Sequence, residues 1–424
     1  MSATDVLLGS SVRSVPAEVT LERARRRARE LGVTRVTDVT RLDRVGLPVF
    51  MSIRPGASVG SLCVNAGKGL RPIEAEVGAT MEAIEFALAE QGASPVTTVR
   101  ATARDVLDGR ERPEAILDLC PKMGRSIPLD APMECVAAEE ITTGGHALVP
   151  AELVFLPYRP PGKRRVLHFG SSSNGLASGN TVREATVHAL CELVERDIRS
   201  FQAVRDTGVP VDLETVDGPV AALVAWLHAA GLELRVRSAD NGLGIPFFSA
   251  VLHDPEALTP HLLNAGYGCH PSRAVAFARA VTEAAQSRLT VIHGGRDDLV
   301  DHRERFKGWT VARKRAHVAS ILARAARGQP VPLSSLPDHA AATPTVEACE
   351  RLLLERLRAG GLRGVYRVAF CRPDDDLQVV RVIVPRMEFL TDILARVGPR
   401  LRDHARSQTR NQTRSQTRSH ARAA

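Results

Sequence analysis

Apolar side chains recur along the chain with two different periods, which predict a mixture of helices and strands. In residues 182–197, Val187, Leu190 and Val194 are spaced three and four positions apart, as on one face of an α-helix. Polar side chains form a separate stripe on the same predicted helix: Glu184, His188, Glu192 and Glu195. The segment is therefore predicted to bury one face and to present acids on another.

Two further segments repeat this pattern. In residues 72–90 the polar face consists of Glu74, Gly78, Glu82 and Glu85, and the apolar face of Val77, Met81, Ile84 and Leu88. In residues 272–288 the polar side chains Arg279, Glu283 and Gln286 align, away from Val281 and Ala285. Three amphipathic helices of one design indicate that their polar faces serve a common site.

The remaining elements alternate without a strict βαβ order. Apolar runs bounded by turn residues predict strands at 45–53, 61–65, 135–140, 148–156, 166–169, 232–237, 247–252, 365–370 and 377–384. Periodic segments predict helices at 21–31, 219–230, 311–327 and 346–360, with a linker at 329–344. We therefore predict an α+β fold with mixed sheets and packed amphipathic helices.

Composition and charge exclude several classes of protein. Of 424 residues, 44% are hydrophobic and 25% charged, which is ordinary for a globular chain. Aromatic residues make up only 4%, too few for the stacking platforms of single-strand binders. The net charge is +8, but residues 401–424 hold six arginines against Asp403, which leaves +3 for the body. We infer no nucleic-acid partner, and the repetitive basic tail at 401–424 is predicted to be disordered.

The cysteines and the lengths of the apolar runs indicate the cellular compartment of the protein. Seven scattered cysteines form no C-x-x-C pair, which is typical of reduced thiols. No run approaches the roughly eighteen apolar residues of a membrane span, and the first thirty residues lack a secretory apolar core. We expect a cytoplasmic protein without a membrane partner.

The acidic stripes allow two interpretations. Acids on a helix usually face water, and Thr181 with Glu184 matches a capping box. Alternatively, carboxylates one and two turns apart hold hard cations, since two of them about 4 Å apart repel by about 4 kcal/mol at an effective dielectric near 20. The loop rich in Gly and Ser at 170–179 would then offer backbone N–H groups to phosphate. The repeated design favours a composite metal and phosphate site.

These motifs together resemble a known family. Residues 175–197 read Gly-Leu-Ala-Ser-Gly-Asn-Thr-x-x-Glu-Ala-x-x-His-x-x-Cys-Glu-x-x-Glu-Arg-Asp, with companion motifs at 81–85 and 279–288. In this order they are similar to the signature of the YcaO family. The resemblance implies a YcaO-like fold with an ATP site between helices, and ATP-dependent O-phosphorylation of a peptide-backbone amide. ATP would be held through Mg²⁺.

The resemblance also implies roles for individual residues. The metal ligands would be Glu82, Glu85, Glu184, Glu192 and Glu195. The ATP contacts would be Arg13, Thr20, Gly78, Asn180, Glu184, Arg196, Arg279, Glu283, Gln286 and Arg288. Position 78 departs from the family, which usually has a small serine there, and Arg13 and Thr20 replace a Lys and a Ser of the same spacing. No general base is identified, so the catalytic residues stay unassigned.

Two features bear on the subclass. The tail lacks the proline-rich end of many azoline-forming members, and residues 32–49 resemble the subgroup that works with a TfuA partner. That subgroup implies thioamide formation on a peptide or protein substrate, with a sulfur donor. Cyclodehydration of Cys, Ser or Thr to an azoline is the alternative, and a non-catalytic accessory protein is a third. The sequence does not determine whether the protein forms a homodimer.

The sequence also predicts a domain organisation and contains some weaker motifs. We predict an N-terminal segment at 1–50 that packs on the core, a catalytic domain at 51–400 and the tail. Zinc at His188, Cys191 and Glu192, or at Cys269 and His270, is a minor alternative, as is Cys191 as a sulfur carrier. Leu62 breaks the phosphate-loop pattern, so Lys68 is predicted to be either a turn residue or a contact that the resemblance implies through the family's own Gly-Lys-Gly.

Overall fold

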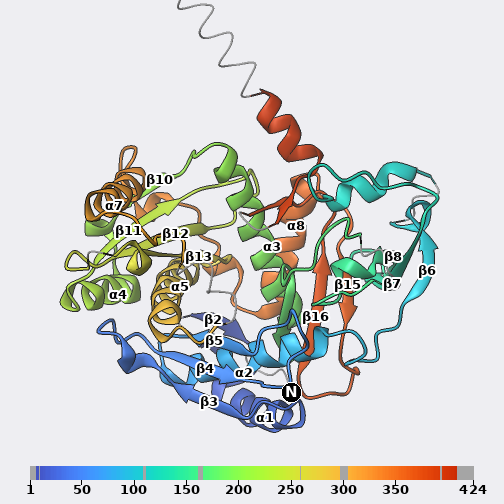
Figure 1. Cartoon of the computed structure of the whole chain (residues 1–424), viewed down its shortest axis with the longest axis horizontal. Helices are drawn as coiled ribbons and strands as arrows, with labels where there is room; N and C mark the ends of the chain where they lie inside the picture. Colours follow the sequence, from blue (N-terminus) through green and yellow to red (C-terminus); the bar gives the residue numbers. More distant parts are fainter. Residues whose placement is uncertain are drawn as a thin grey trace, which may run out of the picture.

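The computed structural model describes residues 6–8, 10–107, 111–160, 166–257, 259–296, 304–391 and 394–407. A five-stranded and a six-stranded sheet occupy the two sides of the molecule, and helix α3 (Val182–Val204) lies between them (Figure 1). A smaller unit, built from the N-terminal segment, covers one end of both sheets. The predicted α+β fold with packed amphipathic helices is confirmed.

The N-terminal unit contains the first acidic helix. It consists of β1 (Val6–Leu8), β2 (Ser11–Arg13), α1 (Ala17–Glu30), β3 (Arg35–Asp38), β4 (Val49–Ile53), β5 (Val64–Lys68) and α2 (Pro72–Ala89). Strands β3, β4 and β5 form an antiparallel sheet, so pairing runs across the expected boundary at residue 50. Helix α1 starts at Ala17, before the predicted residue 21. Strand β5 starts at Val64 instead of Ser61 and extends to Lys68, because Val64 pairs with Ile53 and Lys68 with Val49.

The six-stranded sheet is antiparallel and packs against helices on both faces. Its strands are β6 (Val99–Thr102), β7 (Pro132–Glu140), β8 (Gly145–Pro150), β9 (Leu176–Gly179), β15 (Tyr366–Ala369) and β16 (Gln378–Ile383). Val379 and Ile383 of β16 pack with Ile84 and Leu88 of α2. Val380 and Val382 pack on the other face, with α3 and α8 (Val346–Ala359). The period of two along β16 thus separates two cores.

The five-stranded sheet carries the third acidic helix. Its order is β13 (Asn264–Cys269), β12 (Phe247–His253), β11 (Glu233–Ser238), β10 (Val209–Asp212) and β14 (Val331–Pro332). Only the β10–β14 pair is parallel, which makes the sheet mixed. Helices α4 (Gly218–Ala229) and α5 (Arg273–His293) share its core, and α7 (Val311–Ala325) lies outside it with little buried surface. Strand β14 lies inside the segment predicted to be a linker.

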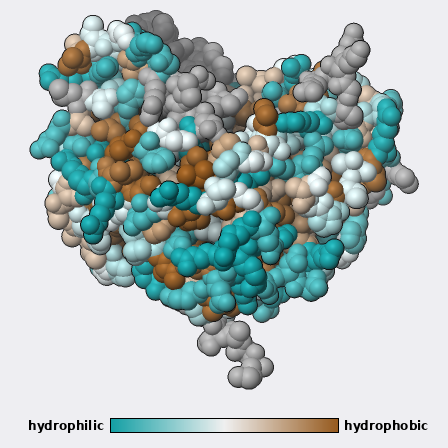
Figure 2. All heavy atoms as spheres, turned by 60° about the horizontal axis from the view of Figure 1, so that its bottom comes forward, coloured by the Kyte–Doolittle hydropathy of each residue, from teal (hydrophilic) through white to brown (hydrophobic). Residues whose placement is uncertain are grey.

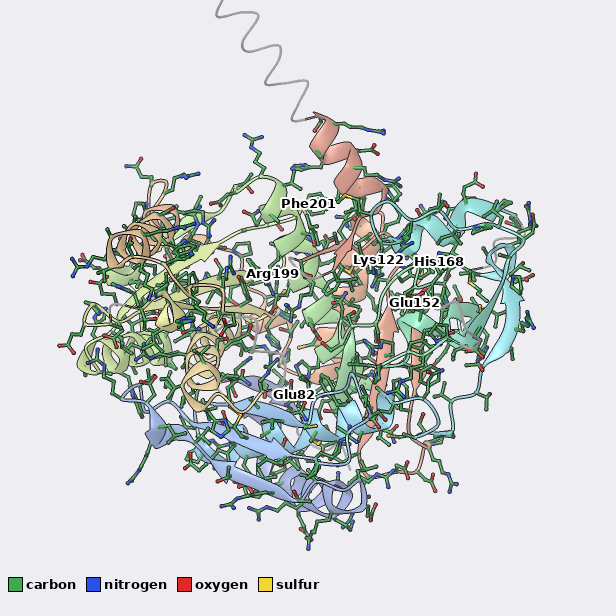
Figure 3. All side chains as sticks on the ribbon, in the orientation of Figure 1. Glu82, Lys122, Glu152, His168, Arg199 and Phe201 are labelled. Atoms are coloured by element: carbon green, nitrogen blue, oxygen red, sulfur yellow. The ribbon has the colours of Figure 1, made fainter. Side chains whose placement is uncertain are left out.

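The strand predicted at 166–169 is absent, and the loop predicted before α3 is correct only in its first part. Residues 166–169 form no strand, because the carboxylate of Glu152 accepts the backbone N–H groups of His168, Phe169 and Gly170. These residues lie close to Lys122, whose N–H bonds the carbonyl of His168 (Figure 3). Residues 176–179 of the predicted loop form the buried strand β9, which pairs with β16. Only 170–175 are irregular.

The chain is helical near its C-terminus, and its surface has both polar and apolar areas (Figure 2). Residues 399–407 are helical, which takes in the first part of the segment predicted to be disordered, and 408–424 lie outside the described residues. The buried side chain of Leu401 anchors this helix to the rest of the molecule. On the face in Figure 2, polar side chains form a broad surface and apolar ones gather in patches above it. Within the described ranges, no helix has the length and apolar character needed to cross a membrane.

Candidate functional site

Each acidic helix follows directly on a strand, and the three strand–helix pairs meet in the middle of the molecule. Strand β5 leads to α2, β9 to α3 and β13 to α5. Helix α3 also contacts β13, and α5 contacts β5, so that each pair touches a neighbouring pair. The polar faces predicted from the sequence are therefore brought to one region.

Glycines on the strands allow the helices to approach this closely. A Cβ added at Gly67 of β5 would lie 2.0 Å from the backbone nitrogen of Ala79 on α2. A Cβ at Gly268 of β13 would lie 2.1 Å from the carbonyl oxygen of Ala276 on α5. Both distances are far below van der Waals contact, so only glycine fits at either position.

The first group of polar side chains surrounds Glu184 at the start of α3. Arg13 Nη1 lies 3.0 Å from Glu184 Oε1, and Ser14 donates to Oε2 through its hydroxyl and its N–H. Asn180 Nδ2 donates to Thr20 Oγ1 and, at 3.3 Å, to Glu184. Burial alone would raise the pKa of Glu184, but Arg13 and Ser14 hold it below the ordinary value. Arg13, Thr20, Asn180 and Glu184 thus form one buried network.

This network also decides the capping alternative. The Thr181 hydroxyl accepts the N–H of Glu184, which is half of a capping box. The carboxylate of Glu184 is directed at Arg13 and Ser14, residues of the N-terminal unit. Glu184 therefore does more than cap its helix.

A second group contains carboxylates from all three helices. Its members are Glu82 and Glu85 on α2, Glu192 and Glu195 on α3, and Glu283 on α5. Glu195 is buried, whereas the others keep part of the side chain accessible. Their charges act on one another: Glu192 raises the pKa of both Glu82 and Glu85, and Glu283 raises that of Glu192 and Glu195. We call these five residues the acid cluster. Figure 3 marks Glu82 among them.

Burial raises the pKa of four of the five carboxyl groups in the acid cluster. It raises the pKa of Glu85 to about 8, with a further increase from Glu82 and Glu192. It raises the pKa of Glu195 to about 7, with a contribution from Glu283. The pKa of Glu283 is lowered, because Lys68 and Arg196 outweigh its burial. The cluster therefore combines carboxyl groups that resist ionisation with Glu283, whose negative charge the neighbouring cations stabilise.

Cationic side chains border the acid cluster. Lys68 Nζ lies 2.6 Å from Glu283 Oε2, and Lys68 ends strand β5, so of its two predicted roles the turn is wrong and a contact at the site agrees with the structure. Arg196 lies 3.5 Å from Glu192 and 3.9 Å from Glu195, and those two acids hold the pKa of its guanidinium above the ordinary value. Arg199 stacks 3.6 Å from the ring centroid of Tyr267 (Figure 3 marks Arg199).

The zinc alternatives are not supported. His188 Nε2 lies 3.1 Å from Arg279 Nη2, and His270 Nδ1 accepts the N–H of Ser272. Burial raises the pKa of Cys191 to about 12 and that of Cys269 well above its usual range, so neither is an accessible thiolate. In the part of the chain that the structure describes, no three His, Cys, Asp or Glu side chains already converge on one point.

Of the other residues expected to contact ATP, some lie near the acid cluster and one lies away from it. Gln286 Nε2 donates to the carbonyl of Ala66 at 2.6 Å, next to Glu82, which accepts the N–H of Ala66. Gly78 faces Gly67, whose Cα would lie 3.2 Å from an added Cβ. The buried guanidinium of Arg288 is paired with Asp43 and Asp254, so it lies on the opposite side of α5 from the acid cluster.

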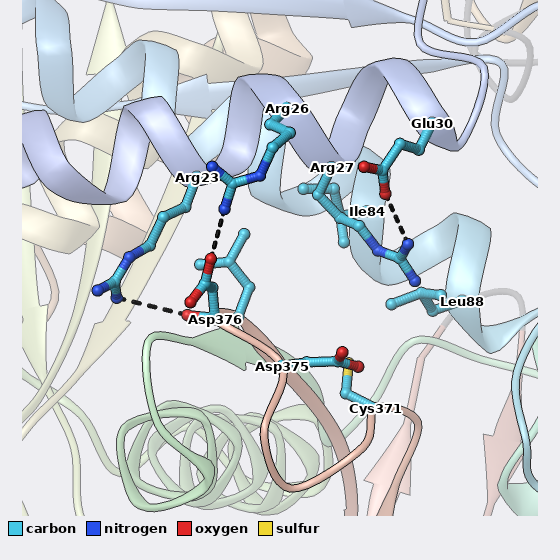
Figure 4. A pocket seen from close by; sticks show the side chains of 10 residues that line it. Arg23, Arg26, Arg27, Glu30, Ile84, Leu88, Cys371, Asp375 and Asp376 are labelled. Carbon is cyan, nitrogen blue, oxygen red and sulfur yellow. Dashed lines mark hydrogen bonds and ion pairs between the residues drawn. The ribbon is translucent and has the colours of Figure 1, made fainter.

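A separate pocket of about 190 Å³ lies between α1, α2 and the segment 371–377 (Figure 4). Its charges are already paired: Arg26 with Asp376, and Arg27 with Glu30 at 2.8 Å. Arg23 reaches both the carbonyl of Asp376 and Asn180 Oδ1, each at 3.4 Å. The pocket therefore borders the Glu184 network but does not contain the acid cluster.

The acid cluster has the chemistry of a site for hard cations. Carboxylates from three helices repel one another electrostatically, although no three of the described acids converge on one point, and a divalent ion would relieve this repulsion. Arg13 and Lys68 outweigh burial at Glu184 and Glu283, whose pKa values are lowered. Burial raises the pKa values of Glu82 and Glu85, and also those of Glu192 and Glu195 in spite of the nearby Arg196. The residues present thus fit magnesium ions that carry phosphate.

Comparison with known proteins agrees with this chemistry. The sequence model of the family described as YcaO cyclodehydratase, ATP- and Mg²⁺-binding, matches residues 66–388. The chain belongs to the YcaO family. ATP and Mg²⁺ are the cofactors of this family, whose members are ATP-dependent peptide-modifying enzymes.

Relatives of this YcaO protein extend over most of its length. An uncharacterized protein of Methanothermobacter thermautotrophicus is 37% identical over 88% of this chain and 94% of its own. A protein of Rhizobium leguminosarum bv. trifolii, described as uncharacterized in the tfuA 3′ region, is 33% identical over 89% of this chain and 88% of its own. The structure of YcaO from Methanopyrus kandleri bound with AMPPCP and Mg²⁺ superposes with a TM-score of 0.71 at 26% identity, covering 93% of this chain and 98% of that one.

Sequence reasoning missed several residues of the site. Ser14 and Ser178 bind Glu184 and Glu85, and Arg199 and Tyr267 border the acid cluster. Arg381, in the middle of apolar β16, interacts electrostatically with Glu192 and Glu85. An arginine inside an apolar strand was a usable signal, because a buried charge needs a partner. The serines gave no signal, since their partners are distant in the sequence.

Proposed function

We propose that this YcaO protein replaces the oxygen of a peptide-backbone amide by sulfur, in an ATP-dependent reaction that requires a TfuA-like partner and a sulfur donor. The observation that carries the proposal is the acid cluster. Carboxylates from three helices act electrostatically on one another, and burial raises the pKa of Glu85 to about 8 and that of Glu195 to about 7. A purely structural role does not explain the retention of so many costly charges.

The protein side of the reaction is mainly binding and orientation. Glu82, Glu85, Glu184, Glu192 and Glu195 would hold Mg²⁺ on the triphosphate. Since Mg²⁺ usually takes one or two carboxylates and completes its shell with phosphate and water, the acids need not converge on one point. Bound ATP would supply the γ-phosphoryl group that makes the amide oxygen a leaving group. Arg13, Asn180, Arg196, Arg279, Glu283 and Gln286 would orient the nucleotide around these ions.

The subclass rests on two independent features. Residues 32–49 resemble the TfuA-associated subgroup, and the Rhizobium relative is named for the region beside tfuA. These two features, the resemblance at 32–49 and the name of the Rhizobium relative, favour sulfur as the incoming atom.

The test uses the full chain with a TfuA-like partner, sulfide, a candidate precursor peptide and Mg·ATP. We expect the peptide to gain the mass difference between sulfur and oxygen. Glu192→Gln and Glu195→Gln should fold normally and lower ATP turnover about a hundredfold or more, because each removes a charge that holds the metal. Glu347→Gln, an exposed acid on α8, is the matched control and should leave turnover unchanged. Unaltered hydrolysis in both cluster variants would refute the assignment.

Azoline formation is the second candidate, and the cyclodehydratase description of the family favours it. In that reaction a Cys, Ser or Thr side chain of the substrate attacks the activated amide. The same mass spectrum separates the two outcomes, since cyclisation removes one water and adds no sulfur. A scaffold without catalysis would bind Mg·ATP and show no turnover with either substrate.

A further inference from the structure

The arginine at the centre of β16 is bonded on only part of its guanidinium. Arg381 is 1% exposed and lies two residues from Val379 and Ile383, on the face of the sheet that packs against α2. Its Nε donates to the carbonyl of Val154 at 3.1 Å and its Nη1 to that of Asn174 at 2.8 Å. Its Nη2 is buried and has no hydrogen-bond partner among the residues that the structure describes. A buried donor without a partner is costly, so it points to a ligand.

The free nitrogen belongs to a side chain at the edge of the acid cluster. Arg381 interacts electrostatically with Glu192 and Glu85, and within the described ranges no carboxylate forms an ion pair with it. Burial lowers the pKa of its guanidinium to about 10, which still leaves it charged near pH 7. The cluster therefore has a fixed cationic donor on its β16 side.

A buried acceptor accompanies this donor. Asn174 Oδ1 is also buried and unpartnered, and it belongs to the residue whose carbonyl holds Arg381. The loop is fixed to β16, because Gly175 O accepts the N–H of Val382 at 2.8 Å. Gly175 has φ +78°, and a Cβ there would lie 2.3 Å from Val382 O, so the loop cannot shift easily. One donor and one acceptor are thus held ready on two neighbouring segments.

We propose that Arg381 and Asn174 form the subsite for the substrate's backbone amide, with Nη2 donating to the amide oxygen and Asn174 Oδ1 accepting the amide N–H. A secondary amide has this pairing of acceptor and donor, whereas a phosphate group offers only acceptors. The inference rests on the proposed function, since the amide that is activated must lie beside the metal-bound phosphate. It adds a substrate contact that does not belong to the nucleotide or metal set.

The first test measures binding and needs no turnover. The probe is N-acetylglycine N-methylamide, a minimal peptide backbone, observed by saturation-transfer NMR on the full chain with Mg·ATP. We expect Asn174→Ala to weaken probe binding about tenfold, the effect of one lost hydrogen bond, and Asn174→Asp to retain it because an acceptor oxygen remains. N,N-dimethylacetamide, which has no N–H, should respond equally weakly in the wild type and in Asn174→Ala.

The second test separates the amide subsite from a phosphate contact. Arg381→Lys should weaken the probe about tenfold and leave the Kd of Mg·ATP within about twofold, since a lysine keeps the charge but not the fixed fork. Arg367→Lys, on the neighbouring strand β15 and paired with Glu139 at 2.7 Å, is the matched control and should change neither. Thermal melting checks that each variant folds.

Three outcomes would overturn the inference. One is wild-type protein that does not bind the probe, and another is Asn174→Ala that binds it unchanged. The third is Arg381→Lys that loses affinity for Mg·ATP while probe binding stays constant, which would make Arg381 a phosphate contact. The proposed function fails on a different result, namely unchanged turnover in Glu192→Gln, so the two failures can be told apart.

Discussion

Burial changes the protonation of individual glutamates in the acid cluster. The pKa of Glu85 is raised to about 8 and that of Glu195 to about 7, in both cases chiefly by burial. Near pH 7 both carboxyl groups therefore hold a substantial fraction of a proton. A divalent cation binds the ionised form, so metal binding must displace these protons.

This protonation predicts a pH dependence with a definite sign. Between about pH 6.5 and 8.5 the affinity for Mg·ATP should rise, by up to about tenfold per pH unit for each proton released. Calorimetry in two buffers of different ionisation enthalpy would count the protons, and Glu85→Gln should release fewer. Since ATP itself is largely deprotonated above about pH 7, the upper half of the range isolates the protein. An affinity that is flat or falls with pH would contradict the expectation.

The same groups act in the opposite direction on the stability of the free protein. The native state binds more protons than the unfolded chain at pH values between the ordinary glutamate pKa and these raised values. The free energy of unfolding contributed by Glu85 and Glu195 is therefore present below that window and is lost as pH rises through about 7 to 8. Mg·ATP should restore more stability at the upper end of the window than at the lower.

At the scale of elements, the site depends on how closely helices approach strands. Helix α2 lies against β5 at Gly67, and α5 lies against β13 at Gly268, at positions where no side chain fits. Because the helices lie so close to the strands, the polar face of each helix is next to the sheet beside it. The close approach also gives a reason for Gly78, whose neighbours are Gly67 and Lys68, because a larger residue would press on β5.

Gly67→Ala tests this arrangement. The added Cβ would meet the backbone of Ala79 and Ala75 at about 2 Å, so α2 must move, at a cost of roughly 3 kcal/mol or more. We expect a lower Tm and, in protein that remains folded, weaker Mg·ATP binding because Glu82 and Glu85 move with α2. Gly56→Ala is the control, since a Cβ there meets nothing within 4 Å and the φ is not positive. Equal stability of the two variants would show that β5 and α2 tolerate separation.

At the scale of the whole molecule, the candidate site joins parts of the chain that are otherwise separate. The N-terminal unit supplies Arg13 and Glu82, α3 supplies Glu192 and Glu195, and the five-stranded side supplies Glu283. A ligand bound among them holds these parts together. Its binding energy should therefore appear as resistance of the whole chain to unfolding.

We accordingly predict that Mg·ATP raises the Tm. At about a hundredfold excess over its Kd, a ligand specific for the native state stabilises by about 2.7 kcal/mol, or a few degrees in Tm. EDTA with ATP should give little increase, and Glu192→Gln should lower the increase obtained with Mg·ATP. Differential scanning fluorimetry measures all three. An equal shift with ATP in EDTA would mean that the nucleotide binds without metal.

The sequence by itself determined which helices carry acids, because the period of 3.6 is a local property that residues three and four apart reveal. It also determined the family, through motifs that each lie within a short stretch. Only the tertiary structure decided which of these residues meet. Arg288 shares the third motif yet pairs with Asp43 and Asp254 on the far side of α5, whereas Arg381 lies in no motif and borders the acid cluster. Partners such as Arg13 and Glu184, 171 positions apart, are set by the packing of sheets and helices, which no local pattern encodes.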